Sequence, residues 1–163
     1  MGEGWGEGDG ESRDGGSCAN AILRALTFSG GAIMVPLSRF RTLVDEAKSR
    51  VRESTPEELL ARRARGENPV LVDVREDDEF RVDHAPGAIH LSRGVLERDV
   101  EKTIPDPGTP LVLYCGGGSR SALAADALRR MGYTEVWSMK GGMRRWRELG
   151  LPVESASSPK EPA

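Results

Sequence analysis

The sequence predicts an α/β domain in which a central parallel sheet is flanked by helices. Two short and nearly continuous apolar runs, Val70–Arg75 and Leu111–Cys115, have the composition of strands that are buried on both faces. Segments with helical spacing of apolar residues precede, separate and follow these runs. Because parallel strands need long crossover connections, the alternation of strands and helices favours a parallel sheet. In such a sheet, ligand sites lie at the carboxyl ends of the strands.

The N-terminal part of the chain differs in composition from the rest. Residues 1–18 are mostly Gly, Glu, Asp and Ser, which predicts a disordered tail. Residues 19–52 are expected to form an extension that contains an amphipathic helix, because apolar side chains recur every three or four positions from Pro36 to Arg52. The regular pattern begins just after Met34, which makes Met34 a candidate for the native start.

The next helix has a clear start signal. Thr55 is expected at its N-cap, Pro56 at the first helical position and Glu58 at the third. The helix is predicted to run to about Arg65 and to end at Gly66.

The strand at Val70–Arg75 is followed by weaker signals. A short helical turn is predicted around Asp77–Arg81, and a brief strand at Ala88–Leu91. A helix is expected over residues 93–104, before the loop Pro105–Gly108.

The second central strand, Leu111–Cys115, is followed by further alternation. Helices are predicted at Arg120–Met131 and Gly142–Leu149, with a strand at Glu135–Ser138 between them. Residues 154–163 are rich in Ser, Pro and Lys and predict a second disordered tail.

Bulk properties exclude several classes of function. At 163 residues the chain suits one domain, and its net charge of −3 gives no positive field for nucleic acid. Its two cysteines, Cys18 and Cys115, imply neither a disulfide framework nor a zinc site, which favours a reducing, cytoplasmic location. Without a long apolar run or a basic leader, neither a membrane partner nor a secretory signal is expected.

The loop that follows Leu111–Cys115 is the most informative feature. Glycines can direct several N–H groups at one point through positive φ angles, and the N-terminus of the next helix favours negative charge. Ser119 is expected to cap this helix, and Arg120 to hold an anionic substrate. The loop therefore predicts Cys115 as a thiolate nucleophile with a lowered pKa, in place of an inert buried thiol. The expected substrate-binding residues of the loop are Gly116, Gly117, Gly118, Ser119 and Arg120.

Four segments, in order along the chain, resemble the rhodanese family of sulfurtransferases. They are Leu71–Arg75 with Glu79 and Phe80, His84–His90, Cys115–Arg120, and Gly141–Gly142 with Trp146. The resemblance covers about residues 52–153. It implies a three-layer rhodanese-like domain at residues 53–153.

The resemblance also implies a two-step reaction. The Cys115 thiolate attacks the outer sulfur of a small anionic donor such as thiosulfate, a persulfide forms, and sulfite leaves. A thiophilic acceptor, which is cyanide or a thiol, then removes the sulfur. The resemblance implies no cofactor and no metal.

The length of the loop separates sulfur transfer from phosphate chemistry. Four residues lie between Cys115 and Arg120, whereas similar cysteine-dependent phosphatases place one more residue there. The shorter ring is expected to suit a sulfur atom and to be too small for phosphate. The loop lacks the basic second residue of dedicated thiosulfate enzymes and the Cys-Gly-Ser/Thr-Gly-Val-Thr pattern of mercaptopyruvate enzymes, so the donor stays open.

Two other functions remain as alternatives. The same cysteine would serve a persulfide carrier or redox-sensing module that delivers sulfur to a protein partner. A non-catalytic interaction domain would retain only the fold, and the presence of Cys115 argues against it.

Other residues receive weaker expectations. Lys140 ends a strand before the Gly141–Gly142 turn and is expected to add positive charge to the substrate site. Asp73 and Arg75 are expected to be structural, with Arg75 paired to Glu79. Cys18 is expected to be a spectator thiol.

Overall fold

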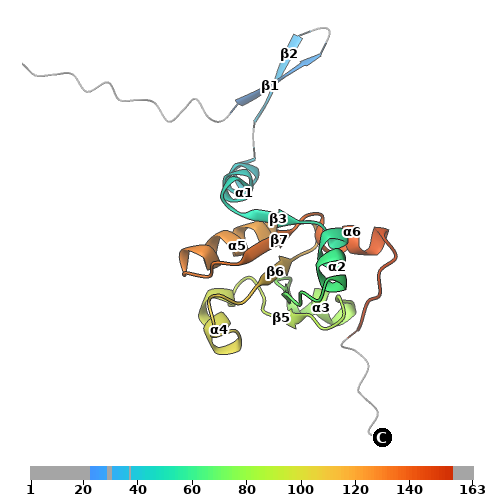
Figure 1. The fold of residues 1–163 in the computed structure, drawn as a ribbon. Coiled ribbons are helices and arrows are strands. Elements are labelled where there is room, and N and C mark those ends of the chain that lie inside the picture. Colours follow the sequence, from blue (N-terminus) through green and yellow to red (C-terminus); the bar gives the residue numbers. More distant parts are fainter. Residues whose placement is uncertain (1–22, 29–30, 37, 156–163) are drawn as a thin grey trace, which may run out of the picture. The chain divides into compact units, whose positions relative to one another are not determined.

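The chain divides into two compact units in a computed structural model that describes residues 23–28, 31–36 and 38–155 (Figure 1). The described part of the first unit is an antiparallel hairpin of β1 (Leu23–Phe28) and β2 (Gly31–Pro36). This hairpin was not predicted from the sequence. The predicted disordered tail at residues 1–18 lies outside the described residues.

The second unit contains the predicted parallel sheet. Its five strands have the order β3-β7-β6-β4-β5, and every neighbouring pair is parallel. The strands are β3 (Arg52–Ser54), β4 (Val70–Asp73), β5 (Ile89–His90), β6 (Leu111–Tyr114) and β7 (Val136–Met139). The buried strands β4 and β6 lie side by side at the centre, as their continuous apolar composition predicts.

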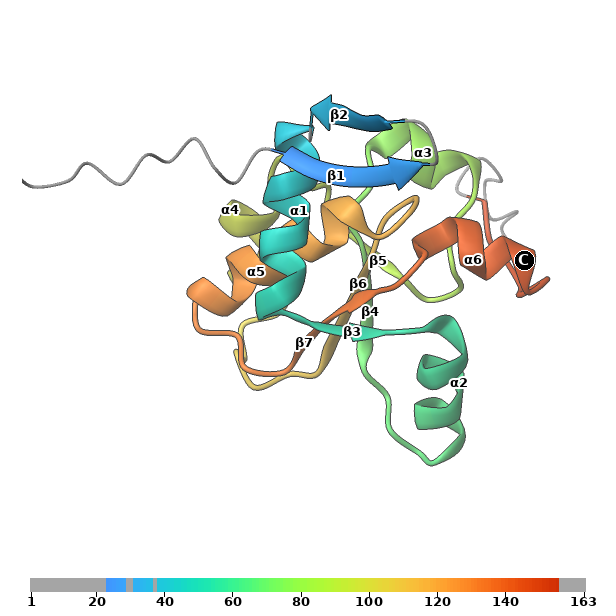
Figure 2. The same ribbon diagram turned by 90° about the horizontal axis from the view of Figure 1, so that it is seen from above.

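Helices cover both faces of this sheet, which gives three layers (Figure 2). The helices are α1 (Arg39–Arg50), α2 (Pro56–Ala64), α3 (Asp77–Val82), α4 (Leu96–Thr103), α5 (Ser119–Arg130) and α6 (Gly142–Glu148). One apolar cluster packs α4 and α5 against the sheet, and the other packs α2 and α6 against the opposite face. The predicted α/β architecture is therefore confirmed.

The predicted start of α2 is confirmed in detail. Thr55 Oγ1 accepts a 3.2 Å hydrogen bond from the backbone N–H of Glu58, and Glu58 Oε2 accepts one of 2.8 Å from the N–H of Thr55. This reciprocal capping satisfies two N–H groups that the helix leaves free. Beyond its end, Gly66 has a φ of 86°, which other residues rarely adopt.

The amphipathic helix α1 buries less of its apolar face than its pattern predicts. Val44 and Ala47 are buried, and α1 packs against α5. Phe40 and Leu43 of the same helix are 54% and 52% exposed.

Two features differ from the predicted boundaries. The edge strand β3 was missed, because a strand of three residues carries no readable period. Glu154, predicted to begin the C-terminal tail, is instead paired with His84 by two backbone hydrogen bonds of 2.8 Å. The rest of that predicted tail, from residue 156, lies outside the described residues.

Among the described residues, none of the helices has the length and apolar character needed to cross a membrane.

Candidate active site

Cys115 lies directly after β6, at the carboxyl end of the central strand. Only 1% of the residue is exposed, and the backbone N–H of Gly118 donates a 3.1 Å hydrogen bond to Sγ. A reagent that reacts with this sulfur must therefore bring a small atom into the loop.

The surroundings of Cys115 favour a thiolate. Burial, the largest single influence, opposes ionisation. Hydrogen bonds from the backbone N–H groups of Ser121, Gly117 and Gly118, and from the Ser121 hydroxyl, outweigh this effect and lower the pKa of Cys115. The direction of the shift agrees with the prediction made from the loop.

The backbone of the loop differs in part from the prediction. Of its three glycines, only Gly118 has a positive φ, at 97°. Gly118 is also the N-cap of α5, and no side chain caps that helix. Ser119 is therefore the first helical residue and not the predicted cap, because the turn at Gly118 starts α5 one residue earlier.

The segment between β7 and α6 supports the loop from behind. The N–H groups of Met143 and Arg144 donate to the carbonyl oxygens of Cys115 and Gly116, at 2.7 and 3.0 Å. These bonds occupy the carbonyl oxygens at the start of the loop and so fix its backbone against α6.

Arg120 is paired with a residue of α3. Its guanidinium makes a two-point ion pair with the Glu79 carboxylate, with N–O distances of 2.5 and 2.9 Å. This hydrogen-bonded pairing lowers the pKa of Glu79 and raises that of Arg120. The charge of Arg120 is therefore partly neutralised at the mouth of the loop.

The pairing predicted for Arg75 is wrong. Arg75 is 2% exposed and makes an ion pair with the fully buried Asp73, at 2.7 Å between Nη2 and Oδ2. It also donates to Asp83. Asp73 and Asp83 hold the guanidinium of Arg75, whereas the carboxylate of Glu79 is bound to Arg120.

Two cavities flank the loop. One of about 330 Å³ lies beside Gly116 and is lined by three acidic residues, namely Asp78, Glu79 and Asp83, and by Arg75 and Arg147. The other, of about 390 Å³, is lined by Lys140, Gly141 and Arg144, and by Thr55, Glu57, Arg145 and Glu148. No residue of the loop Cys115–Arg120 is among those that line the second cavity, so its cations belong to the segment between β7 and α6 and to α6 itself.

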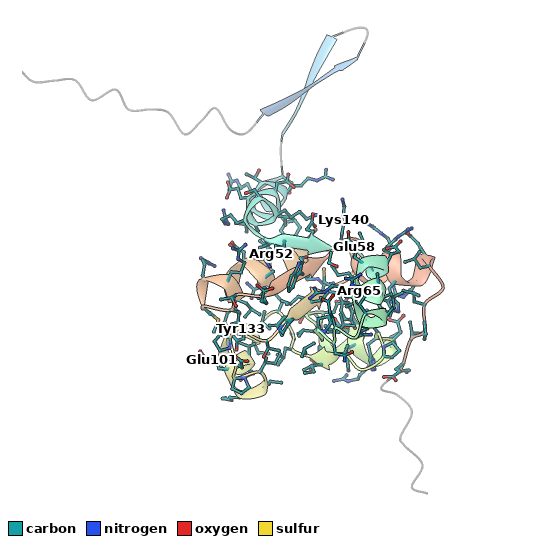
Figure 3. All side chains as sticks on the ribbon, viewed as in Figure 1. Arg52, Glu58, Arg65, Glu101, Tyr133 and Lys140 are labelled. Carbon is teal, nitrogen blue, oxygen red and sulfur yellow. The ribbon has the colours of Figure 1, made fainter. Side chains whose placement is uncertain are left out.

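Lys140 and Arg144 carry the least compensated positive charge of that second cavity. Figure 3 shows Lys140 at the surface near α2 and α6, and no described residue makes an ion pair with it. A Cβ added to Gly117 would lie 4.0 Å from Nη1 of Arg144, whose nearest carboxylate, on Glu148, is 4.0 Å away. Arg144 was missed in the sequence because it resembles any other arginine on a helix surface.

A buried pair of hydroxyl groups adjoins the sulfur. Ser121 Oγ lies 3.7 Å from Cys115 Sγ and 2.9 Å from Ser138 Oγ, and neither serine is exposed. Ser121 and Ser138 were not singled out in the sequence, although a serine inside an apolar strand is an available signal.

No group of three or more His, Cys, Asp or Glu side chains in the described part of the chain is arranged to hold a metal ion. Cys18 lies outside the described residues, so its predicted spectator role is untested.

Comparison with protein families adds independent evidence. The model of the rhodanese-like domain matches residues 55–149. The chain is 34% identical over 86 residues to the thiosulfate sulfurtransferase GlpE of Vibrio cholerae. This aligned part makes up 53% of this chain and 79% of GlpE. It is 38% identical over 76 residues to the uncharacterized protein YqhL of Bacillus subtilis. This aligned part makes up 47% of this chain and 59% of YqhL.

Two solved structures are also similar. The polysulfide-sulfur transferase of Wolinella succinogenes, a homodimer, is 31% identical with a TM-score of 0.62, over 75% of this chain and 91% of that one. A protein of unknown function from Rhodopseudomonas palustris, described as a possible tyrosine phosphatase, is 32% identical with a TM-score of 0.63, over 76% of this chain and 100% of that one.

Proposed function

The chain belongs to the rhodanese-like family, and from this membership and the site geometry we propose that it is a sulfurtransferase that works through a persulfide on Cys115. The observation that carries the proposal is a single buried sulfur that accepts a 3.1 Å hydrogen bond from the N–H of Gly118, in a loop whose N–H groups lower the pKa of Cys115. These donors favour negative charge at that point, in the thiolate and equally in a persulfide anion.

The first step loads the sulfur. The Cys115 thiolate attacks the outer sulfur of an anionic donor such as thiosulfate, a new S–S bond forms, and the S–S bond of the donor breaks. Sulfite leaves with the electron pair of the broken bond, so one negative charge remains on the persulfide. In the second step, cyanide or a thiolate attacks the outer sulfur and Cys115 leaves as the thiolate again.

The residues around Cys115 have separate roles in this proposal. The backbone of Gly116, Gly117, Gly118 and Ser119 forms the cradle for the outer sulfur, and Arg120 stabilises its charge. Because Glu79 partly neutralises Arg120, Lys140 and Arg144 supply the further positive charge that attracts an anionic donor.

Phosphate chemistry fits the site less well. Four residues separate Cys115 from Arg120, and only 1% of Cys115 is exposed. A sulfur atom is smaller than a tetrahedral phosphate. The short loop from Cys115 to Arg120 therefore favours sulfur as the transferred group.

A persulfide carrier that delivers sulfur to a protein partner is the second candidate, because it needs the same cradle. The paired charges on the two cavities beside the loop offer a polar rim for such a partner. Two cysteines without a disulfide framework support a reducing, cytoplasmic location for either activity.

Steady-state turnover with thiosulfate and cyanide separates the two candidates. Thiocyanate formation that Cys115→Ala abolishes supports the enzyme, whereas loading of Cys115 without turnover supports the carrier. Phosphate release from an aryl phosphate, lost in the same variant, would contradict both.

A further inference from the structure

Ser138 is an unusual residue for its position in the fold. It lies in β7, between the edge strand β3 and the central strand β6, where Val136 and Met139 of the same strand are buried and apolar. A buried hydroxyl costs free energy unless it has a hydrogen-bond partner. Among the described residues, the hydroxyl of Ser138 has one hydrogen-bond partner, which is the hydroxyl of Ser121.

The sheet register places this pair next to the reacting sulfur. Ser138 is paired in register with Leu113, two residues before Cys115. Ser121 lies in the first turn of α5 and links the two, since its Oγ is 2.9 Å from Ser138 Oγ and 3.7 Å from Cys115 Sγ. The three side chains therefore form a row that ends at the sulfur.

Counting protons shows which state of the sulfur this row fits. The row has two contacts, one between Ser138 and Ser121 and one between Ser121 and Cys115. When the sulfur carries no proton, as in a thiolate or a persulfide, the two hydroxyl protons fill both contacts. A thiol adds a third proton, and the row then contains no acceptor for one of the three.

The direction of these hydrogen bonds follows from that count. With an unprotonated sulfur, Ser121 donates to Sγ and Ser138 donates to Ser121. A serine in the first turn of a helix can otherwise rotate its hydroxyl toward a backbone carbonyl. The donor from Ser138 fixes the rotation of Ser121 and polarises its hydroxyl toward the sulfur.

We propose that Ser138 is a positioning residue for the sulfur chemistry, which acts on Cys115 by orienting the hydroxyl of Ser121. The inference rests on the proposed function only in taking Cys115 as the reacting thiolate. It assigns to β7 a part in stabilising the thiolate that the loop sequence does not reveal.

The test measures the rate of alkylation of Cys115 by iodoacetamide against pH in the full chain. Alkylation is measured by mass spectrometry of the peptide that contains Cys115, so alkylation of Cys18 does not contribute to the measured rate. No sulfur donor is present, so this result stands apart from any failure of sulfur transfer. The variants are Ser138→Ala, Ser121→Ala and the double variant, with Ser138→Thr to restore the hydroxyl.

Ser54 provides the matched control. It is also a buried serine, on the strand next to β7, and its hydroxyl donates to a backbone carbonyl at 3.3 Å. Ser54→Ala is expected to leave the pH profile unchanged. Ser138→Cys, which is close in volume to serine and a weaker donor, replaces Ser138→Ala if the alanine variant does not fold, with the same expected direction.

The expected result is a profile that moves to higher pH in Ser138→Ala, with alkylation at neutral pH slowed by roughly two- to fivefold. Ser138→Thr is expected to recover most of the rate. In the Ser121→Ala background, removing Ser138 is expected to have no further effect, because the two act in series. An unchanged profile in Ser138→Ala, or an equal effect with and without Ser121, would overturn the proposal.

Discussion

The backbone of Gly142 lies against the carbonyl group of Cys115, so closely that a Cβ on Gly142 would overlap the carbonyl oxygen. Gly142 also has a φ of 53°, in the left-handed region. The close approach lets Met143 donate its N–H to Cys115 and so fixes the start of the loop. The glycine at the beginning of α6 is therefore part of what shapes the cysteine loop, although 26 residues of sequence lie between Cys115 and Gly142.

Gly142→Ala is expected to destabilise the protein and to disturb the loop. Gly150 has a similar φ of 64° but open space around it, so Gly150→Ala carries the backbone strain alone. The strain costs about 1–2 kcal/mol at either position, and the overlap at Gly142 adds about 1–3 kcal/mol. Urea unfolding measures both variants, and equal losses of stability would contradict the packing described here.

Asp73→Asn is expected to cost about 3 kcal/mol of stability, because it leaves the buried charge of Arg75 with only the longer ion pair to Asp83, at 3.5 Å. Glu135→Gln, which breaks the exposed pair with Arg52, is expected to cost less than about 1 kcal/mol. Urea unfolding at neutral pH compares the two. If Asp73→Asn folds with near wild-type stability but loses sulfur loading, Asp73 has a functional role in place of a structural one.

Arg120→Gln is expected to slow sulfur loading of Cys115 by roughly tenfold or more. It removes the cation near the thiolate and leaves the Glu79 carboxylate unpaired at the mouth of the loop. Glu79→Gln is expected to lower the KM for an anionic donor, because it leaves the positive charge of Arg120 without its carboxylate partner. Arg41→Gln on the exposed face of α1 is the control. A lower KM in Arg120→Gln would refute this role.

The stability of the reduced protein is expected to depend on pH through Cys115. Because its pKa is lowered in the folded state, the thiolate stabilises the fold. This contribution is complete above the pKa of the thiol in the unfolded chain, about 8.5, and is lost as the pH falls through the lower pKa of the folded protein. The free energy of unfolding of the wild type, relative to Cys115→Ala, should therefore rise with pH up to about 9. A difference that is flat or falls over this range would contradict a stabilised thiolate.

Much of the fold follows from local signals in the sequence. The continuous apolar runs predict β4 and β6, and Thr55 with Glu58 predicts the start of α2, because each signal involves residues close together in the chain. Strand β3 and the pairing of Glu154 with His84 depend on contacts with distant residues and left no local pattern.

The same distinction applies to the site. Cys115 and its glycines are adjacent in sequence, so the loop could be predicted as a unit. The partners of Arg120 and Arg75 could not be predicted in the same way. The sequence alone does not show which of the two arginines pairs with Glu79 of α3, because that depends on the three-dimensional fold. Arg144 and Ser138 come near the loop only through the turn between β7 and α6 and through the sheet register.

The intact mass of the full chain after exposure to thiosulfate tests the central claim most directly. The predicted result is a gain of one sulfur atom, located on Cys115, absent in Cys115→Ala and removed by cyanide or a thiol. Parallel exposure to mercaptopyruvate identifies the preferred donor. An unchanged mass with both donors, or an added sulfur on Cys18 alone, would contradict the assignment of Cys115 as the sulfur-carrying residue.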